Sequence, residues 1–282
     1  MNALGVVLGE HLNYAFDDPG AVSFLAGVAD VCAAEGTGMM IVPTTGSDDD
    51  VTRVTQAAVD GFIVWTTSDD DPVLAAVRAT RRPAVLHGGP GPDGLRAVSI
   101  DNRAAARAVG AAAFTRALRP AVISQPLDRR RASSLGTSIE IDDVSFPVTR
   151  ERLTGYRDAA EDAGFSWQDV VTAVCSRNSV EEAEAATSAL LSAPDPPDAI
   201  AAMSDQQAIG VLRAARGHGL GVPGDLAVTG FDDLPAAAQL DLTTVAQALR
   251  DQGATCAHLA LGHPTPPSPP SWSLVVRGST RR

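Results

Sequence analysis

Three carboxylates in the sequence have the type and position that recognition of a polar ligand requires. Asp232 follows a strand-like run at 226–229 by three residues. Asp205 and Asp101 stand at the start of helix-like patterns. In open α/β sheets, ligands bind beyond the carboxyl ends of the strands, where helix N-termini and loop donors converge. A carboxylate there can accept hydrogen bonds from sugar hydroxyls or base nitrogens, or it can simply cap a helix or turn.

Aromatic residues occupy similar strand-to-loop positions. Trp65 and Phe231 each end or follow an aliphatic run, and Tyr14 lies in a polar loop after the first run. Such rings can stack on a sugar face or a purine. For Trp65 and Phe231 core packing is an equal alternative, whereas the polar surroundings of Tyr14 favour ligand contact.

Short β-branched runs alternate along the chain with longer segments of helical periodicity, which is typical of parallel α/β sheets. Segment 125–147 interrupts this alternation, contains an arginine run and then overlaps strand-like residues 138–148. A proline-rich stretch at 264–270 favours an extended linker. We therefore expect two sheets, with strands at 4–8, 39–42, 62–65, 84–87, 98–100 and 121–124 in the first and at 170–174, 199–202 and 226–229 in the second.

Length and charge limit the function. A chain of 282 residues is about twice the commonest domain size and predicts two lobes or one large α/β unit. Its net charge of -12, from 34 acidic against 22 basic residues, repels phosphate backbones. These residues are therefore not expected to bind nucleic acid themselves.

Sequence signatures of catalysis and cofactor binding are absent. The glycine-rich segment 88–94 lacks the Gly-Lys-Ser/Thr of a phosphate loop, and no GxSxG or HExxH pattern occurs. Three scattered cysteines do not form a disulfide framework or a CxxC pair. We expect no enzyme activity, no cofactor and no dedicated metal site.

The first apolar run, at 4–8, is too short for a membrane span or a signal sequence. We expect a cytoplasmic protein without membrane contact, although a secreted protein whose leader had been removed would look similar.

One long stretch resembles the LacI/GalR family of transcription regulators. It is SDQQAIGVLRAARGHGLGVPGDLAVTGFDDLPAAAQLDLTTVAQALRDQG at 204–253. RERLTGYRDAAEDAGF at 150–165, VDGFIVW at 59–65, the Asp101-Asn102 pair and LVVRGST at 274–280 extend the resemblance over nearly the whole chain.

The resemblance implies a fold like that of periplasmic binding proteins. Two doubly wound parallel-sheet subdomains are joined by three crossovers, and a small effector binds in the cleft between them. We expect the crossovers near residues 124–127, 245–248 and 263–271. The N-terminal subdomain is expected at 1–125 plus 247–264, and the C-terminal subdomain at 126–246 plus 270–282.

The family's site residues map onto specific positions. Asp232 matches the acid that contacts the effector. Arg152 matches the arginine that reaches into the cleft, where a guanidinium can clamp a carboxylate, a phosphate or paired hydroxyls, and Arg150 is a second candidate. We expect Asp232 and Arg152 to project from opposite walls. Alternatively, Arg152 is a solvated helix residue that pairs with Asp158 or Glu161.

By resemblance, the chain is the effector-binding and dimerisation core of a regulator. The effector is expected to be a sugar or related metabolite, whose binding shifts the lobes of a homodimer. Operator DNA is contacted only through an N-terminal helix-turn-helix headpiece, which these residues lack, either by removal or by nature. A solute-binding protein of a sugar transporter is the alternative.

Overall fold

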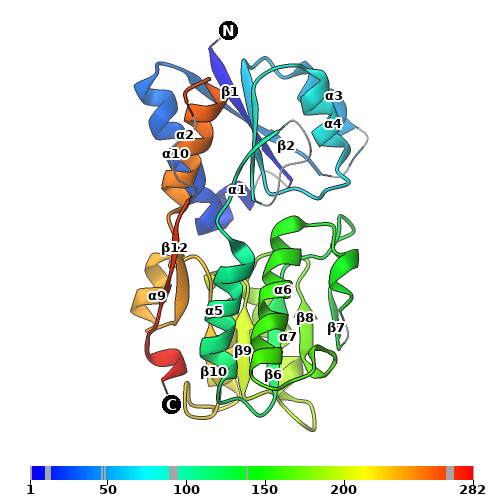
Figure 1. Cartoon of the computed structure of the whole chain (residues 1–282), viewed down its shortest axis with the longest axis vertical. Helices are drawn as coiled ribbons and strands as arrows, with labels where there is room; N and C mark the ends of the chain where they lie inside the picture. Colours follow the sequence, from blue (N-terminus) through cyan, green and yellow to red (C-terminus); the bar gives the residue numbers. More distant parts are fainter. Residues whose placement is uncertain are drawn as a thin grey trace. The chain divides into compact units, whose positions relative to one another are not determined.

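The alternation of aliphatic runs and helical patterns folds into mainly parallel sheets covered by helices. The computed structural model describes residues 2–9, 14–45, 47, 49–88, 95–137, 139–264 and 270–281, without the side chains of residues 14 and 15. The elements fall into two compact units, each built around its own sheet (Figure 1). This confirms the expected fold class.

Unit 1 comprises Met1–Ile100, Ser145–Val148 and Ala248–Ser271. Its five-stranded sheet has the order β2-β1-β3-β4-β5, and each neighbouring pair is parallel. Its elements are β1 (Ala3–Leu8), α1 (Tyr14–Asp17), α2 (Pro19–Ala34), β2 (Gly38–Pro43), α3 (Asp49–Gln56), β3 (Gly61–Trp65), α4 (Pro72–Ala79), β4 (Ala84–His87), β5 (Arg96–Val98) and α10 (Leu249–Ala260).

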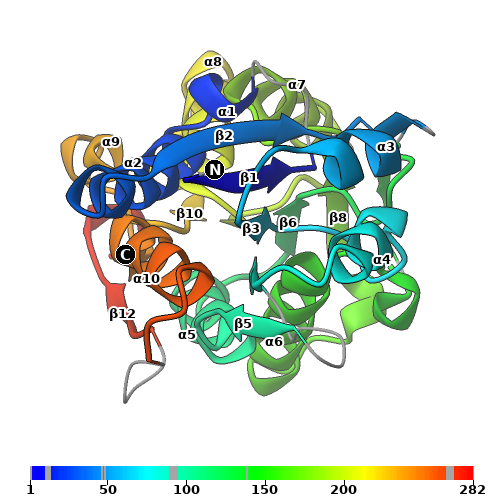
Figure 2. The ribbon, with the colours of Figure 1, turned by 90° about the horizontal axis from the view of Figure 1, so that it is seen from above.

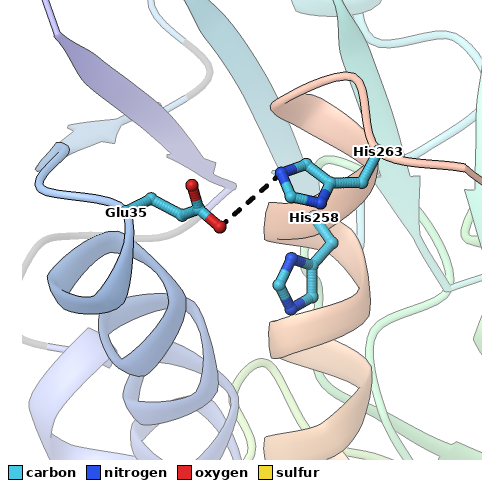
Figure 3. A group of neighbouring side chains, drawn as sticks. All are labelled: Glu35, His258 and His263. Carbon is cyan, nitrogen blue, oxygen red and sulfur yellow. Dashed lines mark ion pairs between the residues drawn. The ribbon is translucent and has the colours of Figure 1, made fainter.

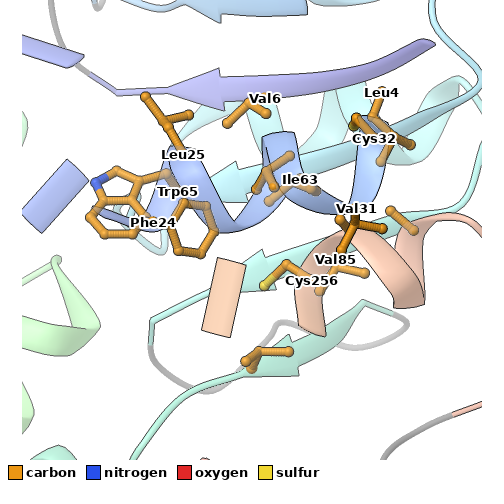
Figure 4. Close-up of a cluster of buried hydrophobic side chains, with 14 of the residues drawn as sticks. Leu4, Val6, Phe24, Leu25, Val31, Cys32, Ile63, Trp65, Val85 and Cys256 are labelled. Atoms are coloured by element: carbon orange, nitrogen blue, oxygen red, sulfur yellow. The ribbon is translucent and has the colours of Figure 1, made fainter. Parts of the chain in front are cut away.

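Side chains alternate across the unit 1 sheet because successive strand residues point to opposite faces. Leu4, Val6 and Leu8 of β1 are buried in the cluster that α2 and α10 complete (Figure 4). Val7 belongs instead to the cluster with α3 and α4. Helices therefore cover both faces of the sheet (Figure 2). Full burial of such a side chain contributes roughly 1.5–3 kcal/mol.

Two glycines set the close spacing of α2 and α10. A Cβ on Gly27 would lie 1.8 Å from the backbone oxygen of Arg250, and one on Gly253 would lie 2.1 Å from the backbone oxygen of Phe24. The two helix backbones can approach this closely because one residue of each contact is a glycine, which has no Cβ.

Replacing Gly253 with alanine should therefore force α2 and α10 apart and lower the free energy of unfolding by about 1–3 kcal/mol. The matched control is Gly217→Ala at the end of α8 (Asp205–Gly217), where an added Cβ meets nothing within 4 Å. That variant should be unchanged or slightly more stable. Urea denaturation measures both, and equal losses in the two variants would contradict the packing argument.

Unit 2 comprises Asp101–Val144, Thr149–Gln247 and Trp272–Arg282. Its five-stranded sheet has the order β10-β9-β6-β8-β7, in which only β7 is antiparallel to its neighbour. The elements are α5 (Asn102–Phe114), β6 (Pro120–Ser124), β7 (Ser134–Gly136), η1 (Ile141–Asp143), α6 (Pro147–Asp162), η2 (Trp167–Asp169), β8 (Val171–Val174), α7 (Val180–Leu191), β9 (Ala199–Ala202), α8, β10 (Ala227–Thr229), α9 (Pro235–Gln239), β11 (Thr244–Gln247), β12 (Trp272–Val275) and η3 (Gly278–Thr280).

Helices also cover the unit 2 sheet. Buried residues of α7 and α8, including Ala183 and Val211, join Ile123 and Ile200 of the strands in one cluster. The β11–β12 pair is antiparallel. Isolated parallel bridges, one of them joining Asp232 to Ala246, connect the end of β10 to β11. The loop after β10 is thereby held along β11.

The first boundary between the units differs from the expected one. The chain enters unit 2 after Ile100, so α5 and β6 belong to unit 2. There β6 pairs with both β8 and β9, although we expected residues 121–124 in the first lobe. The later transitions after Gln247 and Ser271 fall within the expected segments 245–248 and 263–271.

The irregular segment before α6 also departs from expectation. Residues 138–148 look strand-like in sequence, yet the described part forms the 3-10 helix η1 and the start of α6. Ser145–Val148 belongs to unit 1, where the carbonyl of Ser145 accepts a hydrogen bond from the backbone N–H of Asp69 at 2.8 Å. The chain thus has an extra excursion into unit 1 that the family resemblance did not imply.

Within the described residues, none of the helices combines the length and apolar character that crossing a bilayer demands.

Candidate functional site

Two predicted carboxylates and an aromatic residue meet at one edge of the unit 2 sheet. Asp205 begins α8 just after β9, while Phe231 and Asp232 follow the neighbouring parallel strand β10. The backbone N–H of Asp205 donates to the carbonyl of Phe231 at 2.7 Å. The carboxyl ends of β9 and β10 therefore converge, as the rule for ligand sites in open α/β sheets predicts.

Helix α6 brings Arg152 to the same group. The helix packs tightly on α5, since a Cβ on Gly155 would lie 2.3 Å from the backbone oxygen of Arg103. Asp158 of α6 pairs with Arg103 of α5 at 2.7 Å. Asp158 is thus the partner of Arg103, and the alternative in which Arg152 is a solvated residue paired with Asp158 is wrong.

The Arg152 side chain is held firmly, with only 5% of its surface exposed. Its Nε donates to Asn102 Oδ1 at 3.0 Å and its Nη1 to the carbonyl of Met203 at 2.6 Å. The guanidinium carbon lies 3.7 Å from the centre of the Phe231 ring. Nη2 has no hydrogen-bond partner among the described residues. One donor group of a fixed cation therefore remains available.

Charges nearby preserve this cation despite its burial. Burial lowers the pKa of Arg152, and the carboxylate of Asp232 is the largest influence that raises it. An arginine stays protonated in proteins because its intrinsic pKa is so high. The Asp232 carboxylate is therefore near enough to act on the charge of Arg152, and the two side chains can offer a donor and an acceptor to one ligand.

The backbone at Asp232 is unusual. Its φ is +116° and that of Asp233 is +53°, in the region that residues other than glycine rarely adopt. Contacts on the β11 side hold it there. The backbone N–H donates to the carbonyl of Val245 at 2.8 Å, and Oδ1 accepts from Gln247 Nε2 at 2.6 Å. Backbone strain maintained by surrounding contacts is typical of ligand-binding positions.

Asp205 has a different environment. Its side chain is fully buried, and its oxygens accept hydrogen bonds from Thr244 Oγ1 and the Leu234 backbone N–H, both at 2.7 Å. Burial raises the pKa of Asp205 to about 6, although these hydrogen bonds act in the opposite direction. The carboxyl group thus ties the loop after β10 to α8 and β11. We expected Asp205 to contact an effector, but the structure supports a positioning role.

Phe231 and Trp65, for which ligand stacking and core packing were equal alternatives, are both buried. Phe231 is fully buried with Arg152 on its ring face, so it orients the guanidinium rather than stacking on a ligand. Trp65 is 7% exposed in the core of unit 1. It stacks on His87 with ring centres 4.6 Å apart. Its ring centre also lies 4.4 Å from that of Phe24 (Figure 4).

The remaining predicted residues are Asp101, Arg150 and Tyr14, and the contacts described for the first two are structural. Asp101 is the N-cap of α5 and accepts a hydrogen bond from the Ala104 backbone N–H at 2.9 Å. Arg150 donates from Nη1 to the carbonyl of Val144 at 2.6 Å and so supports the turn before α6. Tyr14 is in α1, but its side chain lies outside the described part of the chain.

Arg152 and Asp232 were expected on opposite walls, yet both belong to unit 2. Sequence reasoning also missed the residues that fix them, Asn102 and Gln247. Asn102 was noted only as part of the Asp101-Asn102 pair that opens a helix. Gln247 ends β11, where the sequence suggested a crossover, and no local pattern distinguishes it from a solvated glutamine.

A surface hollow of about 390 Å³ lies elsewhere in unit 2, between β7, β8 and α7. Its walls include Leu135, Cys175 and Glu182, and none of the expected site residues contributes to it. Because the hollow lacks the converging polar groups found beyond β9 and β10, we place the candidate site at Arg152 and Asp232.

Comparisons with known proteins show the family to which the chain belongs. The sequence profile of the periplasmic binding protein-like domain matches residues 129–280. An HTH-type transcriptional regulator of Mycobacterium tuberculosis is 33% identical over 286 residues, which span 99% of this chain and 80% of that protein. The chain belongs to the LacI family of transcription regulators. It is the ligand-sensing core of such a regulator, as the resemblance implied.

Solved structures of other transcription regulators have the same fold. A LacI-family regulator from Corynebacterium glutamicum has a TM-score of 0.89 and 28% identity, and the match covers 99% of this chain and 86% of that one. The complex of the regulator CelR with cellobiose has a TM-score of 0.76 and 26% identity, with coverages of 99% and 84%. The matched relatives are transcription regulators rather than enzymes, and the transporter alternative is not favoured.

Proposed function

We propose that this LacI-family core senses a small polyhydroxylated metabolite, a sugar or a close relative, through Arg152 and Asp232. The observation that carries the proposal is the fixed guanidinium of Arg152, whose Nη2 is unused by the described residues beside the Asp232 carboxylate. A rigid donor next to an acceptor suits neighbouring hydroxyl groups, each of which can donate and accept a hydrogen bond.

Each residue of the group has a distinct role in this proposal. Arg152 donates to the effector and Asp232 accepts from it. Phe231 and Asn102 fix the guanidinium, and Gln247 orients the Asp232 carboxylate. The cellobiose complex of CelR, which is 26% identical to this chain, supports a carbohydrate as the effector class.

The proposal extends to the assembled regulator. We infer a cytoplasmic homodimer, because a two-fold symmetric protein matches the paired half-sites of an operator. DNA contact is assigned to an N-terminal helix-turn-helix headpiece, since the net charge of -12 makes the present residues unsuited to binding DNA.

A thermal-shift screen tests the effector class. The panel contains monosaccharides, disaccharides, sugar phosphates and nucleosides. We expect at least one carbohydrate to raise the melting temperature, because a ligand at 100 times its Kd adds about 2.7 kcal/mol to stability. Asp232→Asn should remove most of this shift while keeping the fold, since an amide oxygen can still accept from Gln247 Nε2.

The matched control is Asp162→Asn, which removes an exposed carboxylate of α6 at 55% side-chain exposure. It should keep the full ligand-induced shift. A panel without any stabilising carbohydrate, or an equal response in Asp232→Asn and the wild type, would contradict the proposal.

A further inference from the structure

Two helix ends meet in unit 1, whereas the residues of the candidate effector site belong to unit 2. Gly20 near the start of α2 lies beside Leu249, the first residue of α10, and Glu35 at the end of α2 lies beside His263 just after α10, so the two helices run in the same direction. Both therefore end at the same corner of the unit. Helix C-termini carry partial negative charge, which favours a cation there.

The turn after α10 places two histidines over one another. Gly262 has a φ of +89°, and its N–H donates to the carbonyl of Leu259 at 3.1 Å. The N–H of His263 donates to the carbonyl of His258 at 3.0 Å. These bonds are the pattern of a Schellman motif, in which a left-handed glycine reverses the chain. The two imidazole rings are consequently 5.0 Å apart.

The end of α2 adds a carboxylate. Glu35 is the C-cap of α2, and its Oε1 lies 3.7 Å from Nε2 of His263 (Figure 3). One potential ligand atom from each of Glu35, His258 and His263 lies within 4.8 Å of the other two. Two imidazole nitrogens and one carboxylate oxygen form a donor set that zinc accepts.

The dimensions fit a bound ion after small side-chain rotations. Zinc lies about 2.0–2.1 Å from nitrogen and oxygen ligands, so tetrahedral ligand atoms are roughly 3.4 Å apart. The side chains of Glu35 and His263 are 40% and 41% exposed, which leaves them free to rotate and leaves the ion accessible to water. The three cysteines, which would compete as ligands, are all buried.

We propose that Glu35, His258 and His263 form a divalent-metal site, with zinc as the ion of best fit and water in the fourth position. The ion ties the end of α2 to the end of α10. This inference does not depend on the proposed effector site, because every residue that it uses belongs to unit 1.

Titration of the tag-free full chain with zinc chloride against a chromophoric chelator tests the proposal. We expect one zinc ion per chain. His258→Ala and His263→Ala should each weaken binding at least about tenfold, because loss of a ligand leaves only two donors. Glu35→Gln should weaken it in the same direction. Cobalt(II) should give the visible absorption of a tetrahedral site in the wild type and not in the two histidine variants.

His218→Ala is the matched control, because His218 is an exposed histidine at the C-cap of α8 in unit 2. It should bind zinc as the wild type does. Equal zinc affinity of the wild type and a His258→Ala/His263→Ala double variant would overturn the proposal, as would an equal loss in His218→Ala. Thermal melts without metal confirm that the variants, all at exposed positions or in the last turn, remain folded.

Discussion

Replacing Arg152 with methionine should weaken binding of the effector found by the screen by at least about 30-fold, which corresponds to about 2 kcal/mol. Methionine keeps much of the apolar contact with Phe231 but removes the cation and the free Nη2 donor. The carboxylate of Asp232 also loses the cation beside it. Calorimetric titration of both proteins measures the change.

The variant should also be less stable, by about 1–3 kcal/mol, because Asn102 Oδ1 and the carbonyl of Met203 lose their donor in a buried site. Affinity is therefore measured well below the melting temperature of each protein.

The Arg152→Lys variant shows whether the charge alone is enough for binding. Its ammonium keeps the positive charge without the planar fork of a guanidinium, so it should bind the effector with intermediate affinity. Arg107→Ala, at an exposed position of α5, should bind like the wild type. Undiminished affinity of the methionine variant would remove Arg152 from the site.

The unfolding free energy should fall as the pH rises from about 4 to about 6, because of Asp205. Burial raises the folded-state pKa of this carboxyl group to about 6 from its ordinary value of 3.8. Between these two values the folded protein binds more protons than the unfolded chain, so raising the pH favours unfolding. The full contribution is on the order of 3 kcal/mol, present below the unfolded pKa and lost above the folded one.

Asp205→Asn should remove this part of the pH dependence, because an amide does not titrate. Denaturation at several pH values, with the wild type and the variant compared at each, isolates the contribution of Asp205 from that of other groups. Asp162→Asn makes the same change in net charge and leaves Asp205 in place, so it should retain the wild-type slope. Parallel stability curves for the wild type and Asp205→Asn would show that the buried carboxyl group does not titrate in this range.

Much of the fold follows from local sequence patterns, because aliphatic runs and helical periodicity report burial directly. The run at 199–202 is strand β9, and most other predicted strands are correct to within about two residues. Local patterns do not show to which of the two sheets a strand belongs. Residues 121–124 have the same buried parallel-strand pattern in either unit, and only the three-dimensional path of α5 places them in unit 2.

The site residues, too, could be predicted from the sequence only in part. Asp232 is found from sequence because strand ends gather ligands, and Arg152 is found because its motif resembles that of the family. The roles of Asp205 and Phe231 could not be decided from sequence, because helix capping, core packing and ligand contact require the same residue types. His258, His263 and Glu35 show no motif at all, since the turn at Gly262 and the packing of α2 on α10 bring them together.

The most direct test is a crystal structure of this chain with the carbohydrate that stabilises it most. Hydroxyl groups of the bound compound should lie within hydrogen-bond distance of Arg152 Nη2 and of the Asp232 carboxylate. Density for that compound at a position where it contacts neither side chain would contradict the account.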